Sequence, residues 1–311
     1  AALHLACEAA GLTAGEEVLC PALTFVASAN AILYTGARPV FVDILGPRNL
    51  NLSAADAASK ITERSRAIMV VHYAGYPCDL DAIRDLAQRY GLAIIEDCAH
   101  APGAVYHSGD GLNSNKNMTT GEGGMVVTAD DALAQKIKIA RSHGMTSLTW
   151  DRHKGHSFSY DVVARGYNYR LDEMRAALGL AQLQRLEVGN DRRRQLTGMY
   201  QEKLKPLPQL EIPFLGVPEG SAHHIFPVLL KDGALRPAFM SHLAKEGIQT
   251  SIHYPPIHHF TYYRQLWPPD FNHCLPHTEA VAGREVTLPL FPAMTSTQLE
   301  LVVQSIFKFF A

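Results

Sequence analysis

Ala93-Ile94-Ile95-Glu96-Asp97 is a short apolar run that ends in two acids. Its composition predicts a buried strand with Asp97 at its carboxyl end. Between such runs lie helical patterns, for example at Leu80 to Tyr90. The alternation predicts an α/β fold with a mainly parallel sheet covered by helices, where ligands bind beyond the strands' carboxyl ends. The other predicted strands are Glu17 to Leu19, Val40 to Val42, Ile68 to Val71 and Met125 to Val127.

A lysine follows in a run rich in Gly and Thr, Ser114-Asn115-Lys116-Asn117-Met118-Thr119-Thr120-Gly121-Glu122-Gly123-Gly124. The glycines predict tight backbone turns, an unusual setting for an ordinary surface charge. Lys116 supplies an amine for a Schiff base, and Asp97 supplies a carboxylate for a pyridinium nitrogen. An acid that caps the next helix is the commoner interpretation of Asp97 alone. Together the two residues favour a site for pyridoxal phosphate.

Distinctive blocks extend over nearly the whole chain. Besides the lysine run, they are Cys20-Pro21-Ala22-Leu23-Thr24-Phe25, Gly36-Ala37-Arg38-Pro39-Val40-Phe41-Val42-Asp43, Glu96-Asp97-Cys98-Ala99-His100-Ala101, Gly166-Tyr167-Asn168-Tyr169-Arg170, His253-Tyr254-Pro255-Pro256 and Leu288-Pro289-Leu290-Phe291-Pro292. In these blocks and their order the chain resembles the DegT/StrS family of pyridoxal-phosphate-dependent sugar aminotransferases. The resemblance implies the fold-type I architecture of aspartate aminotransferase, with a large domain and a smaller C-terminal α/β domain.

The domain boundary is expected where a long helical pattern ends. The pattern runs from Asp172, a plausible N-cap, to about Leu204, and Pro206 and Pro208 follow it. We therefore predict a large cofactor-binding domain at residues 1–205 and a small domain at 206–311. One face of the helix is expected to carry Met174, Leu178, Ala181 and Leu186.

The resemblance implies roles for residues around the cofactor ring. Lys116 forms the Schiff base and, once displaced, moves a proton between the substrate carbon and the cofactor carbon. Asp97 keeps the pyridine nitrogen protonated, Phe25 stacks on the ring, and His100 lies near the phenolic oxygen. Core packing is the alternative for Phe25, and an ordinary hydrogen-bonded histidine is the alternative for His100. Some relatives carry His at the lysine position and are sugar dehydratases, so Lys116 argues against that branch.

Two further groups of residues are expected to contact the phosphate of the cofactor. Ala1 and Ala2 open a helix that relatives precede with Gly-Thr or Gly-Ser, so the resemblance implies that part of this cradle is absent from the sequence given. Asn168 is implied to reach the phosphate from a neighbouring subunit, which predicts a homodimer with shared active sites. A surface loop is the alternative for Asn168. Between Tyr106 and Lys116 relatives also carry more residues, including a serine where this chain has Gly111.

Substrate contacts are expected from Tyr169 and Arg170, and from a His/Tyr-rich cluster containing His253, Tyr254 and His258. The neighbouring histidines also allow a zinc hydrolase as a competing hypothesis. The sequence puts no carboxylate or cysteine at ligand spacing beside them, and prolines interrupt the stretch. Substrate contact is therefore favoured, and no metal is predicted.

Composition limits the remaining classes of function. The chain has 311 residues, of which 47% are hydrophobic, and a net charge of −2, so nucleic acid is not an expected partner. Five scattered cysteines without C-x-x-C spacing indicate neither a disulfide framework nor a thiolate zinc site. No apolar run is long enough to span a bilayer, and the start lacks a signal-peptide pattern. A cytoplasmic protein without a membrane partner is expected.

The expected reaction moves an amino group from glutamate or glutamine to a keto group of a nucleotide-linked sugar. A variant of this hypothesis has a cyclitol or another cyclic ketone as the acceptor. A different class is a non-catalytic family member, since the Gly-Thr and the serine are not in the sequence. Lys116 together with Asp97 argues against that alternative.

Overall fold

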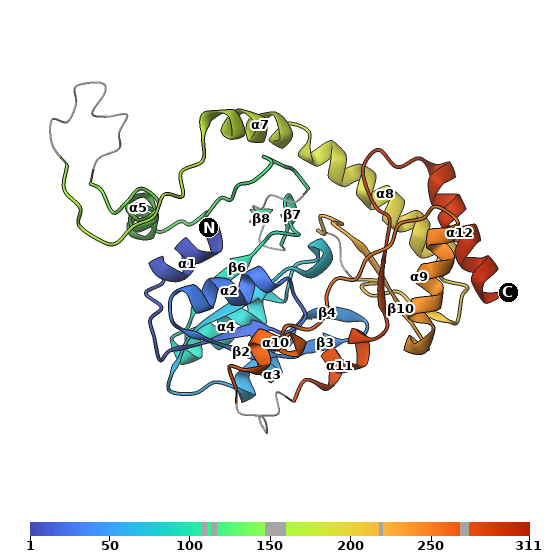
Figure 1. The fold of residues 1–311 in the computed structure, drawn as a ribbon, viewed down its shortest axis with the longest axis horizontal. Coiled ribbons are helices and arrows are strands. Elements are labelled where there is room, and N and C mark those ends of the chain that lie inside the picture. The colour runs from blue at the N-terminus through green and yellow to red at the C-terminus, as the bar shows by residue number, and fades with distance from the viewer. Residues whose placement is uncertain (107–110, 113–116, 147–159, 218–219, 268–273) are drawn as a thin grey trace.

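A computed structural model describes residues 1–106, 111–112, 117–146, 160–217, 220–267 and 274–311 (Figure 1). The main sheet has four parallel strands in the order β2-β1-β5-β6. Each corresponds to a strand predicted from the sequence, so the parallel α/β fold is confirmed. Val71 pairs with Asp97, which puts Asp97 at the carboxyl edge of the sheet. The strands are β1 (Glu17–Pro21), β2 (Arg38–Val42), β5 (Ser65–Val71) and β6 (Ala93–Asp97).

Helices cover both faces of this sheet because successive strand residues point to opposite sides. Leu19 and Ile68 belong to a buried cluster with α3 and α4 on one face. Val18 and Met69 belong to another, with α1 and α2, on the opposite face. Both faces are therefore apolar. The covering helices are α1 (Ala2–Ala9), α2 (Val26–Tyr34), α3 (Ala54–Ser59) and α4 (Leu80–Tyr90).

The strand predicted at Met125 to Val127 is wrong. These residues form no strand in the structure, and Met125 and Val127 are 65% and 58% exposed. Gly124 fits closely against α1 instead, since a Cβ there would lie 2.8 Å from the Ala2 Cβ. A short apolar run favours a strand only where a partner strand is available, and this segment passes along α1.

The single helix predicted from Asp172 to Leu204 is two helices, α7 (Glu173–Leu183) and α8 (Leu186–Leu204). Asp172 is the N-cap, as predicted, and its carboxylate accepts from the Arg175 amide. The Arg185 amide donates to the carbonyl of Gln182, and this tighter i to i−3 bond marks the break. No residue of α7, including those of its predicted apolar face, is buried by the part of the chain that the structure describes.

A second, antiparallel sheet in the order β11-β10-β9 packs against the end of α8. Leu196, Tyr200 and Leu204 of α8 share its buried cluster with residues of α9 and α12. Figure 1 shows these elements gathered at one end of the molecule. They are β9 (Leu210–Glu211), β10 (Phe226–Leu230), β11 (Glu285–Leu288), α9 (Arg236–Lys245) and α12 (Ser296–Phe310).

A segment of the C-terminal region returns to the main sheet. The Ile257 amide donates to the Ala22 carbonyl at 2.9 Å, just after β1. Ile257, Tyr263 and Trp267 then share a buried cluster with Ala22 and Phe41. The division at residues 205 and 206 stays a prediction, and this segment contacts both sides of it. Its elements are η3 (Ile257–His259), α10 (Thr261–Arg264) and α11 (Pro276–Ala282).

The remaining elements are short and connect these layers. They are β3 (Ile44–Gly46), β4 (Asn49–Leu52), η1 (Tyr73–Gly75), β7 (Ala104–Val105), β8 (Gly111–Leu112), α5 (Asp131–Ala140) and η2 (Gly233–Leu235). Across the described ranges, no helix combines the length and apolar character needed to cross a bilayer.

Candidate active site

Asp97 is held from two sides at the end of β6. The Ser28 hydroxyl in α2 donates to Asp97 Oδ2 at 2.7 Å, and the Ala99 amide donates to Oδ1 at 3.0 Å. Asp97 is only 6% exposed, yet it lines a cavity. The bond to Ala99 is the local turn expected of a capping acid, but Ser28 lies 69 positions away in the sequence. The carboxylate therefore has one fixed orientation.

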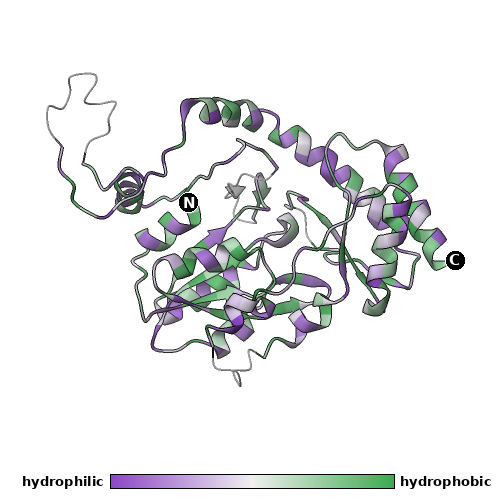
Figure 2. Cartoon of the chain, in the orientation of Figure 1, coloured by the Kyte–Doolittle hydropathy of each residue, from purple (hydrophilic) through white to green (hydrophobic). Residues whose placement is uncertain are grey.

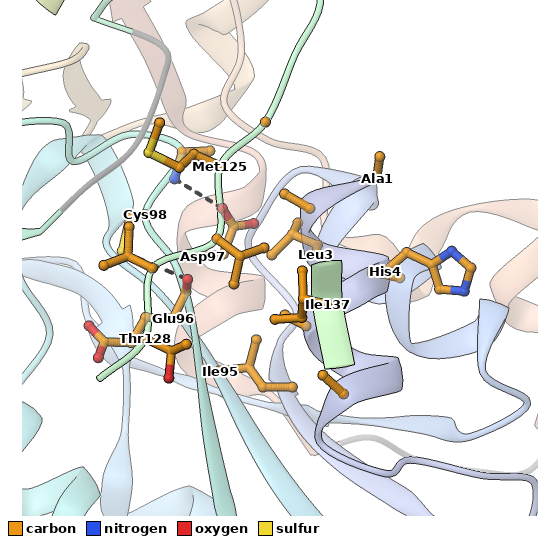
Figure 3. A pocket seen from close by; sticks show the side chains of 18 of the residues that line it. Ala1, Leu3, His4, Ile95, Glu96, Asp97, Cys98, Met125, Thr128 and Ile137 are labelled. Carbon is orange, nitrogen blue, oxygen red and sulfur yellow. Dashed lines mark hydrogen bonds between the residues drawn. The ribbon is translucent and has the colours of Figure 1, made fainter. Parts of the chain in front are cut away.

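The cavity around Asp97 brings together several predicted cofactor residues. Ala1, the N-cap of α1, and Ala2 line it on one side, and Phe25, the N-cap of α2, lines it too. Figure 3 shows Asp97 between Met125 on one side and Ala1 and Leu3 on the other. Phe25 is 49% exposed.

His100 occupies a second, buried position near this cavity. Its Nδ1 accepts a hydrogen bond from the Ala74 amide at 3.3 Å. A neutral imidazole then carries its proton on Nε2, which lies 2.8 Å from the Tyr254 hydroxyl and donates to it. The Tyr254 ring also lies 5.8 Å from Phe25, between ring centroids. Tyr254 thus joins the predicted His/Tyr cluster to the cavity.

Lys116 lies outside the described residues, but its neighbour Asn117 is firmly anchored. The Asn117 amide group donates to Asn190 Oδ1 at 2.8 Å and to the Ala222 carbonyl at 2.7 Å. His224 Nδ1 lies 2.7 Å from Asn117 Oδ1 and donates to it. The His224 ring lies 4.5 Å from that of His100, between centroids. The sequence pattern gave no separate role to Asn117, Asn190 or His224, although the place of Asn117 beside Lys116 was an available signal.

His253 lies in a polar chain that reaches into the C-terminal sheet. Its Nδ1 is 2.9 Å from Thr287 Oγ1, and the Thr287 hydroxyl donates to Glu285 Oε1 at 2.6 Å. The His253 amide donates to Glu285 Oε2 at 2.8 Å, and Tyr73 donates to the His253 carbonyl. Burial raises the pKa of Glu285 to about 8, while the bonds from Thr287 and His253 oppose the rise. Sequence reasoning missed this carboxyl group.

The block that ends in Arg170 lies at a different place within the chain. Asn168 forms an isolated bridge with Ser142, and Arg170 Nη1 lies 3.3 Å from Ser142 Oγ. The Tyr169 hydroxyl lies 3.2 Å from His4 Nδ1 on α1. Asn168, Tyr169 and Arg170 are all exposed. One chain therefore does not bring these side chains to the Asp97 carboxylate.

His258 also lies apart from Tyr254 in its contacts. Its Nε2 is 2.6 Å from Glu279 Oε1 in α11, and His259 Nε2 is 2.8 Å from the same oxygen. No carboxylate stands at ligand spacing beside these histidines in the sequence, but the fold brings Glu279 of α11 to them.

Comparisons with known proteins found similar sequences and structures. The model of the DegT/DnrJ/EryC1/StrS aminotransferase family matches residues 1–307. An uncharacterized protein of Methanocaldococcus jannaschii is 37% identical, over 99% of this chain and 83% of that protein. The crystal structure of S. venezuelae DesV in complex with a ketimine intermediate has a TM-score of 0.87 and 33% identity, over 99% of this chain and 82% of DesV. The sugar aminotransferase CalS13 from Micromonospora echinospora gives the same score and identity, over 99% and 84%.

Proposed function

Because the chain belongs to the DegT/DnrJ/EryC1/StrS aminotransferase family, we propose that it moves an amino group from glutamate or glutamine to a keto group of a nucleotide-linked sugar. At a coarser level it is a sugar aminotransferase that works with pyridoxal 5'-phosphate on small-molecule substrates. The orientation of Asp97, fixed by Ser28 and Ala99, is the observation that carries the proposal.

The residues present fit this cofactor. When bound, pyridoxal phosphate supplies an aldehyde that accepts an amine and a ring that accepts electrons. In our proposal Asp97 holds the pyridine nitrogen protonated, and Phe25 packs against the ring. His100 lies toward the phenolic oxygen, and the start of α1 at Ala1 and Ala2 faces the phosphate. All of these except His100 line the same cavity.

Proton transfer is assigned to Lys116. Its amine attaches the cofactor and, once released, moves the proton at the substrate carbon. Asn117, held by Asn190 and His224, fixes the chain on the carboxyl side of this lysine. His253 and Tyr254 are proposed substrate contacts. His258 differs from them, because Glu279 holds its Nε2.

A homodimer with shared sites accounts for the exposed block. Asn168 is proposed to reach the phosphate of the partner's cofactor, with Tyr169 and Arg170 at the partner's substrate. The helix that follows supports this arrangement: Met174 is 82% exposed and Leu180 is 66% exposed, and Figure 2 shows apolar residues along α7. Such a face is expected to be covered by another surface.

The proposal is tested first by absorbance spectroscopy. Protein incubated with pyridoxal phosphate and desalted should keep the cofactor's absorbance, and glutamate or glutamine should then change that spectrum. Mass spectrometry should detect an amino sugar when a nucleotide-linked keto sugar is added to the donor-treated enzyme. Turnover of a cyclitol ketone but of no keto sugar would favour the other acceptor. A protein that retains no cofactor would support a non-catalytic family member.

A further inference from the structure

Two histidines and one carboxylate meet at a point that the proposed reaction does not use. His258 and His259 end η3, and Glu279 lies in the first turn of α11. One ring nitrogen of each histidine and one carboxylate oxygen all lie within 4.8 Å of one another. The Glu279 and His259 side chains are 49% and 45% exposed, while His258 is 10% exposed. Solvent therefore reaches the cluster at Glu279 and His259, while His258 is largely buried.

We propose that His258, His259 and Glu279 form a binding site for a divalent cation of the Zn²⁺ class. Two imidazoles and one carboxylate, with a fourth position left to water, are an established ligand set for zinc. The imidazoles favour Zn²⁺, Co²⁺, Ni²⁺ or Cu²⁺ over Mg²⁺ and Ca²⁺, which prefer oxygen ligands.

The distances require only a small opening of the cluster. Ligand atoms about 2.1 Å from a tetrahedral zinc are about 3.3 to 3.4 Å apart. The contacts from Glu279 Oε1 to the two Nε2 atoms are 2.6 and 2.8 Å. Each must lengthen by about 0.5 to 0.8 Å on binding. Glu279 is exposed enough to make this movement, and each imidazole then carries its proton on Nδ1.

Neighbouring charges also favour a cation. Asp43 adds a negative charge, and it is fixed by the Thr278 amide and hydroxyl at 2.7 Å. Arg264 is an opposing cation, and its Nε donates to the His259 carbonyl at 2.9 Å.

A second group of three candidate ligands is not proposed as a metal site, because of a hydrogen bond to its histidine. His72, Glu96 and Cys98 also lie within ligand distance of one another. The Cys78 amide donates to His72 Nδ1 at 3.0 Å, so a neutral His72 carries its proton on Nε2, toward Glu96. A metal at Nε2 would require a proton on Nδ1, where it would meet that amide.

Bound metal would join α11 to the segment that follows Tyr254. That segment is attached to β1 through the Ile257 amide and to His100 through Tyr254. A cation bound only in the folded state stabilises that state in proportion to its occupancy. Bound metal is therefore expected to stabilise the position of the segment that follows His253 and Tyr254.

The test is a titration of the holoenzyme with cobalt after treatment with EDTA and desalting. Cobalt chloride should produce the visible d–d bands of a four-coordinate site with one ion per chain, and zinc chloride should remove them. Zinc alone should raise the melting temperature by several degrees. Glu279→Gln and His259→Gln should each lower the affinity at least tenfold, while melting near the wild-type temperature without metal.

Two control variants identify the site. His277→Gln changes an exposed histidine of the same helix, and Cys98→Ser changes the other cluster; both should bind cobalt as the wild type does. Absence of cobalt bands in the wild type would overturn the proposal. Unchanged affinity in Glu279→Gln and His259→Gln would do the same, as would loss of binding in Cys98→Ser alone.

Discussion

Two regions differ in how fully they are packed within one chain: the surroundings of Asp97, and the segment from Asn168 through α7. Asp97 has hydrogen bonds from α2 and from the Ala99 amide. Asn168 is exposed, and α7 buries none of its residues. Buried polar groups are satisfied locally, whereas an exposed apolar helix indicates a surface that another molecule covers. The first region is therefore expected to respond to changes within one chain, and the second to subunit pairing.

The largest expected effect is on the proposed chemistry at the cofactor, to which Asp97 and Lys116 both contribute. Lys116→Ala should lower turnover by several orders of magnitude, because attachment of the cofactor and proton transfer are both lost. Borohydride reduction and peptide mapping should place the cofactor on Lys116 in the wild type. Lys136→Ala changes a lysine that lines the same cavity and should keep the label. Label on any lysine other than Lys116 would contradict the assignment.

Asp97→Asn should retain the fold and lose most of the activity. An amide cannot hold the pyridine nitrogen protonated, although it still accepts a bond from Ser28. Circular dichroism and turnover measure the two outcomes separately. Asp130→Asn is a matched control, because Asp130 caps α5 through the Ala132 and Leu133 amides. Near-normal turnover of Asp97→Asn would contradict the proposed role and indicate that Asp97 only caps the backbone, as Asp130 does.

Complementation tests the other side of the comparison. Asn168→Asp should be inactive, since a carboxylate would repel the cofactor phosphate across the interface. Refolding it with an equal amount of Lys116→Ala should yield about half mixed dimers, each with one intact site of two. Activity should therefore recover to about a quarter of the wild-type value. If labelled subunits exchange fully and activity stays at the level of the separate variants, Asn168 is an ordinary loop residue.

The smallest effect concerns stability. Glu285 has its pKa raised from 4.5 to about 8 by burial, so the folded chain keeps a proton that the unfolded chain releases between these values. The proton held by the folded chain contributes fully to the free energy of unfolding below the unfolded pKa, and this contribution is lost as pH rises through about 8. Glu285→Gln removes this pH dependence. The free energy of unfolding of the variant, relative to that of the wild type, should therefore increase by on the order of a few kcal/mol between about pH 5 and 8. Urea unfolding at both pH values measures the difference, and a constant difference would contradict the prediction.

The sequence predicted the local parts of this molecule well. The four parallel strands, the bounds of α4 and the N-cap at Asp172 follow from periodicity and capping, which depend on neighbouring residues. The Met125 to Val127 strand was wrong because strand pairing depends on a partner outside the run. The predicted long helix breaks after α7, at a turn that amphipathic spacing does not reveal.

The candidate site was predicted less completely, for a related reason. Asp97, Phe25 and the start of α1 line one cavity. Ser28 and Glu279 were missed, because each meets its partner across a long stretch of sequence. Such contacts follow from the packing of whole elements, so no spacing between neighbouring residues indicates them.

The chain of contacts from Glu285 through Thr287 to His253 has a consequence for proton positions. With Glu285 ionised, the Thr287 hydroxyl donates to it and accepts from His253 Nδ1, so Nε2 of that ring carries a lone pair. A protonated Glu285 donates to Thr287 instead, which turns the hydroxyl proton toward His253 Nδ1. His253 then takes the other tautomer, with its proton on Nε2. A carboxyl group inside the C-terminal sheet thus decides whether a proposed substrate contact accepts or donates a hydrogen bond.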